Sequence, residues 1–248
     1  GVLGVAWLSI HSDLSVPLES LGWVLGAVGI GSALGSAIFP SLVRLQPHLN
    51  LLWICLAGQA LVFFLVILSD AYWMFVVLYW IRGIANGVAH AALNSFFAQR
   101  ISPYHLMNIH GGWGVGTASA GLLSGLMIAS GLGWESIYLL GGLLSLVAMS
   151  AVFVTRHNFH HLDVSLAPSE SGAFRMTVPI AFAVVSGALY VGLEQGVGNW
   201  VSSILVAMDG ASIKEAGGAT GVFWGGLTLG RFTLTRIPGS TVQMLRRA

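Results

Sequence analysis

Charge and cysteine are scarce in this chain, and each shortage excludes a class of protein. Charged residues make up 8% of the 248 residues, against about 25% in an average soluble domain, so the composition excludes a soluble globular domain. Ten Lys and Arg against nine Asp and Glu leave a net charge of +1, which gives no electrostatic reason to expect nucleic acid as a partner. Cys55 is the only cysteine, so no internal disulfide can form and the redox compartment stays undecided.

Apolar residues and glycine are abundant instead. Hydrophobic residues make up 56% of the chain, in long runs without the strict alternation that strands of a membrane barrel require. Glycine supplies 33 residues, and small residues allow membrane helices to pack closely. We therefore expect an all-α polytopic membrane protein.

Seven apolar stretches are each long enough to cross a hydrocarbon core of roughly 30 Å. They cover about 20–43, 50–69, 71–98, 105–130, 134–155, 177–206 and 215–237. A shorter run from Gly1 to Ile10 would rise only about 15 Å as a helix, and we interpret it as part of a truncated helix. The sequence thus predicts about seven and a half membrane spans.

Basic residues are unevenly distributed between alternate loops. One set of loops and the tail carry Arg44, Arg100, Arg156, Arg175, Arg236, Arg246 and Arg247. The intervening loops carry Asp13, Glu19, Asp70, Glu135, Asp209 and Glu215, with Lys214 as their basic residue. Because basic loops stay in the cytoplasm, the first set is predicted to lie inside and the second outside.

The first and last of the seven stretches share a glycine pattern. At an offset of 195 residues, Gly22, Gly26, Gly31 and Gly35 fall on Gly217, Gly221, Gly226 and Gly230. Parallel repeats are typical of transporters built from two six-helix halves, with the substrate site between the halves. The alternative is that two glycine-rich packing helices look alike without being a repeat.

Polar side chains recur every four residues along the span at 71–98. These are Arg82, Asn86, His90 and Asn94, which share one slowly drifting helix face. A charged group near the bilayer centre costs at least about 2.5–3.5 kcal/mol, so this face is expected to line a water-filled path. The alternative is a stripe of hydrogen bonds that only joins neighbouring helices.

Glu194 is the only acidic residue well inside a span, and its neighbours are typical of a binding site. Three nearby glycines weaken the helix, and the other flanking residues offer hydrogen bonds and aromatic faces. The predicted binding or coupling residues of this segment are Tyr190, Glu194, Asn199 and Trp200. A buried acid that can change its charge suits proton coupling, whereas the alternative is a structural pair with an arginine such as Arg82.

Two further spans contribute candidate residues. Asn108, His110 and Trp113 of the span at 105–130 are predicted to face a solute cavity, although its glycines are interpreted as packing residues. Gly230, Arg231 and Arg236 lie toward the predicted cytoplasmic end of the last span, where we expect a gating or packing role.

A membrane di-iron hydroxylase or desaturase is an alternative from another class of protein. His105 and His110, and His157, His160 and His161, have spacings that occur in such enzymes, and clustered imidazoles can bind a metal. A third histidine box is lacking, however, so we expect no metal, no cofactor and no enzymatic activity.

Four segments together resemble the major facilitator superfamily, and within it the fucose-permease-like sugar:proton symporters. These segments are Gly83 to Asn94, Asn108 to Gly116, Tyr190 to Trp200 and Phe223 to Arg231. In the first of them, His90 stands where the family has an acid. The resemblance implies a bundle of 12 helices, of which about 7.5 are present, in a bacterial cytoplasmic (inner) membrane.

These observations predict a proton-coupled secondary transporter of a small polar solute, which works by alternating access; the resemblance implies a sugar as the solute. Residues 1–155 are expected to form an N-terminal six-helix bundle with a truncated first helix, 156–176 a cytoplasmic loop, and 177–248 the first two helices of an incomplete C-terminal bundle. The expected partners are the solute, protons and membrane lipid, and the protein is expected to be a monomer. The alternative transport function is efflux of amphipathic compounds.

The predicted orientation can be tested by cysteine labelling of the intact protein in cells. In a background that lacks Cys55, an impermeant thiol reagent added outside should miss Ser171→Cys and label Ser212→Cys, because the arginine-bearing loops are cytoplasmic. Labelling in the reverse pattern would contradict the orientation.

Overall fold

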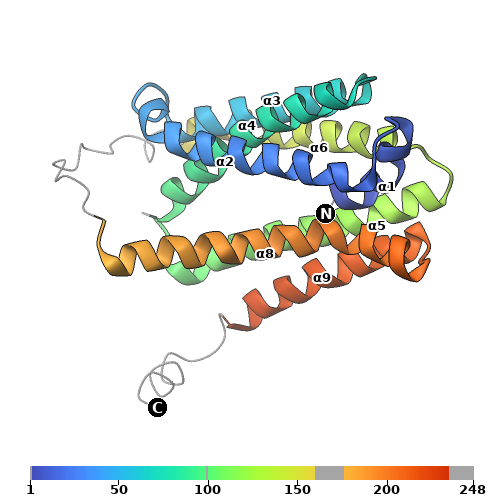
Figure 1. Ribbon diagram of the computed structural model, residues 1–248. Helices are drawn as coiled ribbons and strands as arrows, with labels where there is room; N and C mark the ends of the chain where they lie inside the picture. The colour runs from blue at the N-terminus through green and yellow to red at the C-terminus, as the bar shows by residue number, and fades with distance from the viewer. Residues whose placement is uncertain (1, 99, 160–175, 235–248) are drawn as a thin grey trace, which may run out of the picture.

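The computed structural model describes residues 2–98, 100–159 and 176–234, and this part of the chain is helical (Figure 1). Its eight α-helices are α1 (Val2–Asp13), α2 (Leu21–Leu42), α3 (His48–Ile67), α4 (Tyr72–Ala98), α5 (Pro103–Ala129), α6 (Trp134–Thr155), α8 (Val178–Asp209) and α9 (Ile213–Leu234). Two short 3-10 helices cover Leu18–Ser20 and Arg156–Phe159. The all-α prediction is confirmed for the described residues.

Six segments are long and apolar enough to cross a membrane. They are Leu18–Leu42, His48–Ile67, Tyr72–Ala98, His105–Ala129, Trp134–Asn158 and Val178–Asp209, and they coincide with six of the seven predicted spans. The predicted span at 215–237 does not belong to this set, although α9 is a helix there. Its charged residues and many glycines make α9 less apolar than the other long helices.

The helices form two groups joined by α1. In Figure 1, α2, α3, α4 and α6 lie together on one side, and α5, α8 and α9 lie on the other. The pairs α2–α4, α3–α4 and α3–α6 pack together in the first group, and α5–α9 and α8–α9 in the second. α1 packs against α5, α6 and α8, so this short helix lies between the two groups.

Hydrogen bonds fix α1 at its middle and at its C-terminal end. The indole N–H of Trp7, which is fully buried, donates to the carbonyl of Leu18 at 2.8 Å. At the C-terminal end of the helix, the indole N–H of Trp134 donates to the Asp13 carboxylate at 2.7 Å. These bonds satisfy the polar atoms of aromatic residues that belong to the largest apolar cluster of the described chain.

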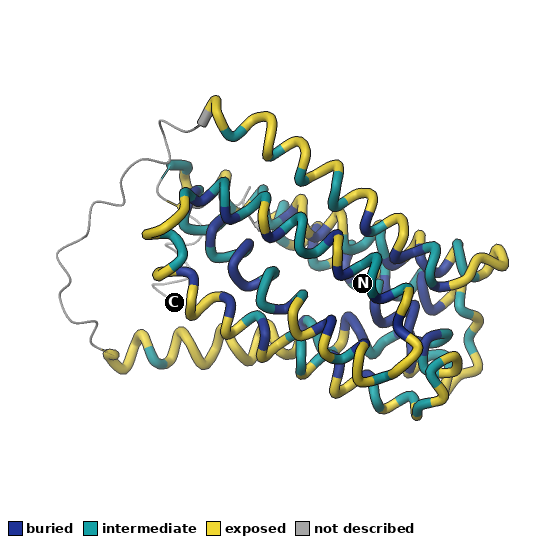
Figure 2. The backbone as a smooth tube through the Cα atoms, turned by 90° about the horizontal axis from the view of Figure 1, so that it is seen from above, coloured by how far each residue is buried: buried dark blue, intermediate teal, exposed yellow. Residues whose placement is uncertain are grey.

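Large apolar side chains also cover much of the outer surface. Trp23, Leu61, Val147, Val154 and Leu193 are each more than half exposed, and Figure 2 shows exposed residues along entire helices. An exposed apolar surface of this size is typical of helices that face lipid. The structure and the composition therefore agree on an integral membrane protein.

Glycines bring α2 and α4 into direct backbone contact. A Cβ atom at Gly35 would collide with the carbonyl oxygen of Ile84, and one at Gly87 would collide with that of Ser32. The hydroxyl of Ser32 donates to the carbonyl of Gly83 at 3.1 Å across the same contact. Such close approach is possible only where the side chain is absent.

The α5–α9 pair has the same kind of contact, but at different repeat positions. Gly125 and Gly217 face each other, since a Cβ at Gly217 would lie 2.7 Å from the Gly125 Cα. Gly217 aligns with Gly22 of α2, yet α2 makes its close contacts at Gly31 and Gly35. The counterparts of those two glycines in α9 have open space where a Cβ would lie. The two aligned helices thus use opposite ends of the shared pattern.

Helix ends follow local sequence signals. Ser102 caps α5 by accepting a hydrogen bond from the His105 N–H, with a proline in the first turn. At the start of α9, Ser212 and Glu215 bond each other reciprocally, with the Ser212 N–H donating to the carboxylate at 2.8 Å. The hydrogen bonds from Ser212 lower the pKa of the Glu215 carboxyl.

Two glycines of α2 provide a matched test of the helix contact. Gly35→Ala should destabilise the protein by about 1–3 kcal/mol, because the added methyl group collides with the α4 backbone. Gly29→Ala, where no atom lies within 4 Å of the new Cβ, should leave stability unchanged or raise it. Unfolding in detergent measures both, and equal stability of the two variants would contradict the contact.

Candidate functional site

An ion pair between α8 and α9 is the central polar feature of the described chain. Nη2 of Arg231 lies 2.9 Å from each carboxylate oxygen of Glu194 and donates to the Tyr190 hydroxyl at 3.1 Å. The side chain of Glu194 is 6% exposed and that of Arg231 is 17% exposed. Because an unpaired buried charge is costly, this pairing allows both groups to lie inside the protein.

The pair joins the middle of α8 to the last turn of α9. Glu194 is in the middle of α8, about 23 Å along the helix axis from Asp209. Arg231 is about 27 Å from the start of α9, and the two helices are joined by a short loop, so the pair lies at a similar depth in each. Arg231 thus lies in the last turn of α9, near a helix end as expected, but it is Arg231 rather than Arg82 that pairs with Glu194.

Aromatic rings form one wall of the site. The guanidinium carbon of Arg231 lies 5.6 Å from the centre of the Trp113 ring of α5. Trp113 in turn meets Trp224 edge-on, with ring centres 5.2 Å apart. Trp224 is fully buried against Gly198, where any Cβ would collide with its ring.

Trp224 is absent from the predicted site residues, although a signal for it exists. It precedes Arg231 by two helical turns and therefore lies on the same face of α9. Neighbouring helices α5, α8 and α9 thus each contribute to one cluster, which we call the α8–α9 site: Trp113, Tyr190, Glu194, Trp224 and Arg231.

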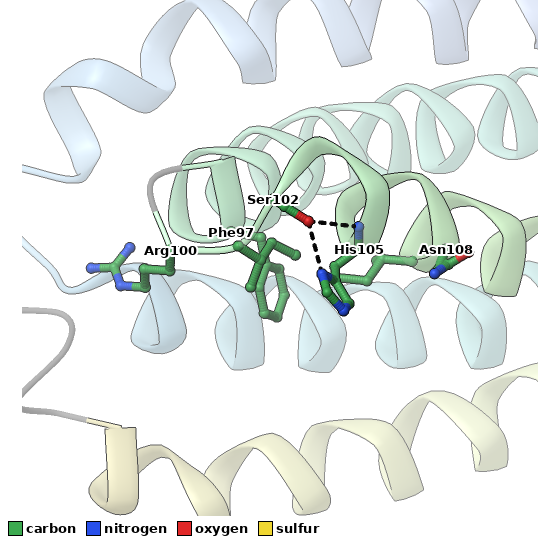
Figure 3. Close-up of a pocket in the computed structure, with 7 residues that line it drawn as sticks. Phe97, Arg100, Ser102, His105 and Asn108 are labelled. Carbon is green, nitrogen blue, oxygen red and sulfur yellow. Dashed lines mark hydrogen bonds between the residues drawn. The ribbon is translucent and has the colours of Figure 1, made fainter. Parts of the chain in front are cut away.

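A cavity of about 730 Å³ opens where α4 ends and α5 begins (Figure 3). It is lined by Phe97, Arg100, Ile101, Ser102, His105, Asn108 and Ile109. The Ser102 hydroxyl is hydrogen-bonded to Nδ1 of His105 at 2.8 Å, as Figure 3 shows. Of the predicted solute residues, Asn108 lines this cavity, whose lining carries cationic and polar groups and no acidic side chain among the described residues.

The polar residues of α4 do not share a single partner. The guanidinium of Arg82 lies over Phe63 and Tyr79, 4.9 and 5.5 Å from the ring centres, and Asn86 donates to the Ser32 hydroxyl of α2 at 3.4 Å. Residues four apart are offset by about 40° round a helix, which explains why successive residues meet different neighbours.

Toward the C-terminal end of α4, the polar face of this helix approaches α5. His90 is half-buried and interacts electrostatically with His110 of α5. Asn94 is half-buried one turn further along. The predicted water path along all four residues is therefore divided between contacts with α2, α3 and α5.

The other candidates of α8 contact different helices from the ion pair. Asn199 donates to the Gln195 carbonyl at 2.8 Å, and its own backbone lies directly against Gly4 of α1. Trp200 packs against the apolar cluster around α1. α8 runs unbroken through the glycines near Glu194, so the expected weakening of the helix does not interrupt it in this state.

The remaining predicted residues have no shared site. Gly230 is exposed with open space beside it, and Arg236 lies outside the described residues. Among the described residues, no group of three His, Cys, Asp or Glu side chains could hold a metal ion. His160 and His161, on which the di-iron alternative also depends, lie outside that part of the chain.

No protein-family model matches the chain, and no curated protein matches it either. The helices themselves identify a membrane protein with six candidate spans. Its function must accordingly be argued from the α8–α9 site and the cavity.

The ion pair can be tested by a double substitution. Glu194→Gln or Arg231→Gln alone should each destabilise the protein by about 3–5 kcal/mol, because each leaves one buried charge unpaired. The double variant should be more stable than either single variant, as thermal unfolding in detergent would measure. Lys214→Gln, at the exposed start of α9, is the control and should change little; additive losses in the double variant would exclude the pairing.

Proposed function

We propose that the protein is a secondary active transporter of a small polar solute, coupled to protons and working by alternating access. The observation that carries this proposal is the largely buried Glu194–Arg231 pair, held between α8 and α9. Ionisable residues inside a membrane segment are costly and usually mark a solute or proton pathway. A purely structural role would not require a charged pair where an apolar contact is often as stable.

Protonation of Glu194 gives the site two states. With the carboxylate ionised, Arg231 bridges α8 and α9 through Glu194 and Tyr190. With a proton on Glu194 the attraction is lost, and the guanidinium is free to bind a polar solute. Protonation of Glu194 can thus replace the contact between Arg231 and Glu194 by one between Arg231 and the solute. A conformational change requires such a difference in interactions between its two states.

The surroundings of the pair leave room for movement of α5 within the second helix group. α5 and α9 meet through glycines, and Gly112 and Gly116 of α5 have open space beside them. The cavity at the α4–α5 junction offers an aqueous approach to the same helix. Rocking of two helix groups around a central site is the usual mechanism of transporters with repeated halves.

The motifs that resemble the major facilitator superfamily fit this function. In this proposal His90 and Asn94 contact the solute, whereas Glu194 carries the proton. The resemblance also implies a bacterial inner membrane and a monomeric transporter. Efflux of amphipathic compounds fits less well, because the α8–α9 site combines an ion pair with a hydroxyl group rather than an apolar lining.

Replacement of Glu194 tests the coupling. In the intact protein reconstituted into vesicles, Glu194→Gln should abolish solute accumulation driven by a proton gradient and retain solute exchange, which moves no net proton. Radiolabelled uptake with and without internal solute measures both. Lys214→Gln is the matched control at an exposed position and should keep both activities.

His90→Ala tests the assignment of the solute contact. This variant should weaken solute binding at every pH, because a contact is removed rather than a proton carrier. The opposite result would be that transport by His90→Ala loses only its dependence on pH, while Glu194→Gln accumulates solute normally. In that case His90 carries the proton and Glu194 contacts the solute.

A further inference from the structure

We infer that the solute of the α8–α9 site carries a carboxylate, which binds Arg231 and is taken up together with one proton on Glu194. This inference rests on the proposed transport function and adds the chemical class of the solute. It is derived from the unused hydrogen-bonding capacity of Arg231, the charge balance of the site and the position of the cavity.

Only one edge of the Arg231 guanidinium is occupied. Nη2 alone donates to both oxygens of Glu194 and to the Tyr190 hydroxyl. Nη1 is buried and has no hydrogen-bond partner among the described residues. Arginine–carboxylate pairs are frequently bidentate, through two nitrogens, whereas this geometry leaves a second nitrogen for another acceptor.

The charge of the site favours an acidic solute that arrives with a proton. Two ionised carboxylates on one guanidinium would leave an excess negative charge inside the membrane, at high cost. If the solute carboxylate binds Arg231 while Glu194 takes up a proton, one ion pair replaces another. An O–H bond forms on Glu194, its ion pair with Arg231 breaks, and the net charge of the site stays the same.

The cavity begins one helical turn from the ring that covers this arginine. Ile109, which lines the cavity, is one helical turn from Trp113 on the same face of α5. Trp113 is the ring over which the Arg231 guanidinium lies. Arg100 also lines the cavity, where its positive charge raises the local concentration of an anion.

Few ionisable groups of the described chain could take up the proton in place of Glu194. Arg231 of α9 and Tyr190 of α8 form its hydrogen-bonded group. The other His, Lys and acidic side chains of α1, α5 and α9 lie or interact elsewhere: His11 with Val16, Asp13 with Trp134, His105 with Ser102, His110 with His90 and Glu215 with Ser212, while Lys214 is exposed at the start of α9. Glu194 is therefore the group expected to take up the proton.

Binding of matched probes to the intact protein in detergent tests the solute class. The probes are lactate with its neutral amide, lactamide, and gluconate with neutral glucose, and saturation-transfer NMR measures their weak binding. We expect at least about tenfold tighter binding of an acid than of its neutral counterpart, since a hydrogen-bonded charge pair is worth more than a neutral contact.

Arg231→Lys should keep an ion pair with Glu194 but lose this preference, because an ammonium lacks the second planar nitrogen. Lys214→Gln should bind as the wild type does.

The pH dependence provides a second measurement. If one proton is taken up with the acid, the affinity should rise by up to about tenfold for each unit of pH decrease while Glu194 is ionised in the unbound protein. Glu194→Gln should bind the acid with little pH dependence. Infrared difference spectra should show a protonated carboxyl group on binding, and Glu194→Gln should lack it.

Each outcome decides the proposal. Equal binding of acids and neutral probes, acid binding that Arg231→Lys retains, or no binding of either acid would overturn it. Dodecanoate that binds when neither soluble acid does would assign the site to a lipid carboxylate and also overturn it. If the protein accumulates only neutral solutes in response to a proton gradient, the proposed transport function is supported and the carboxylate inference is refuted. Acid binding with proton uptake but no accumulation in vesicles would instead refute transport and keep the site.

Discussion

Close contact between glycine faces is the interaction on which the rest of this structure depends. Within lipid, no hydrophobic force drives one apolar helix to associate with another. Helix association therefore depends on dispersion contacts at short range. The α2–α4 and α5–α9 pairs achieve this where glycines place one backbone against the next. The other helices attach to these two pairs, with α1 lying between the groups.

The same constraint explains how an ion pair can be buried between α8 and α9. Close approach of α5 and α9 brings Trp113 over Arg231, and Gly198 of α8 leaves the space that Trp224 fills. Water is largely excluded from Glu194 as a result, which strengthens its attraction to Arg231 and also makes a lone charge there costly. Packing and electrostatics therefore depend on the same few small residues.

Sequence patterns predict the helices well because length and hydropathy are local properties. Six spans match, and α9 differs only because its glycines and charged residues make it less apolar. The partner of Glu194 is not predictable in this way, since it depends on the lateral order of helices, which hydropathy does not encode. Likewise, the glycine pattern predicts close packing, but not that α2 and α9 use different parts of it.

The position of α5 connects packing with the site. Its glycines at 121 and 125 contact α9, its ring at Trp113 covers Arg231, and its first turns line the cavity. A shift of α5 along α9 would therefore move the aromatic wall relative to the guanidinium and change the cavity at the same time. Because rigid helices transmit such shifts along their length, the contact that holds the two helices together also couples the geometry of the α8–α9 site to that of the cavity.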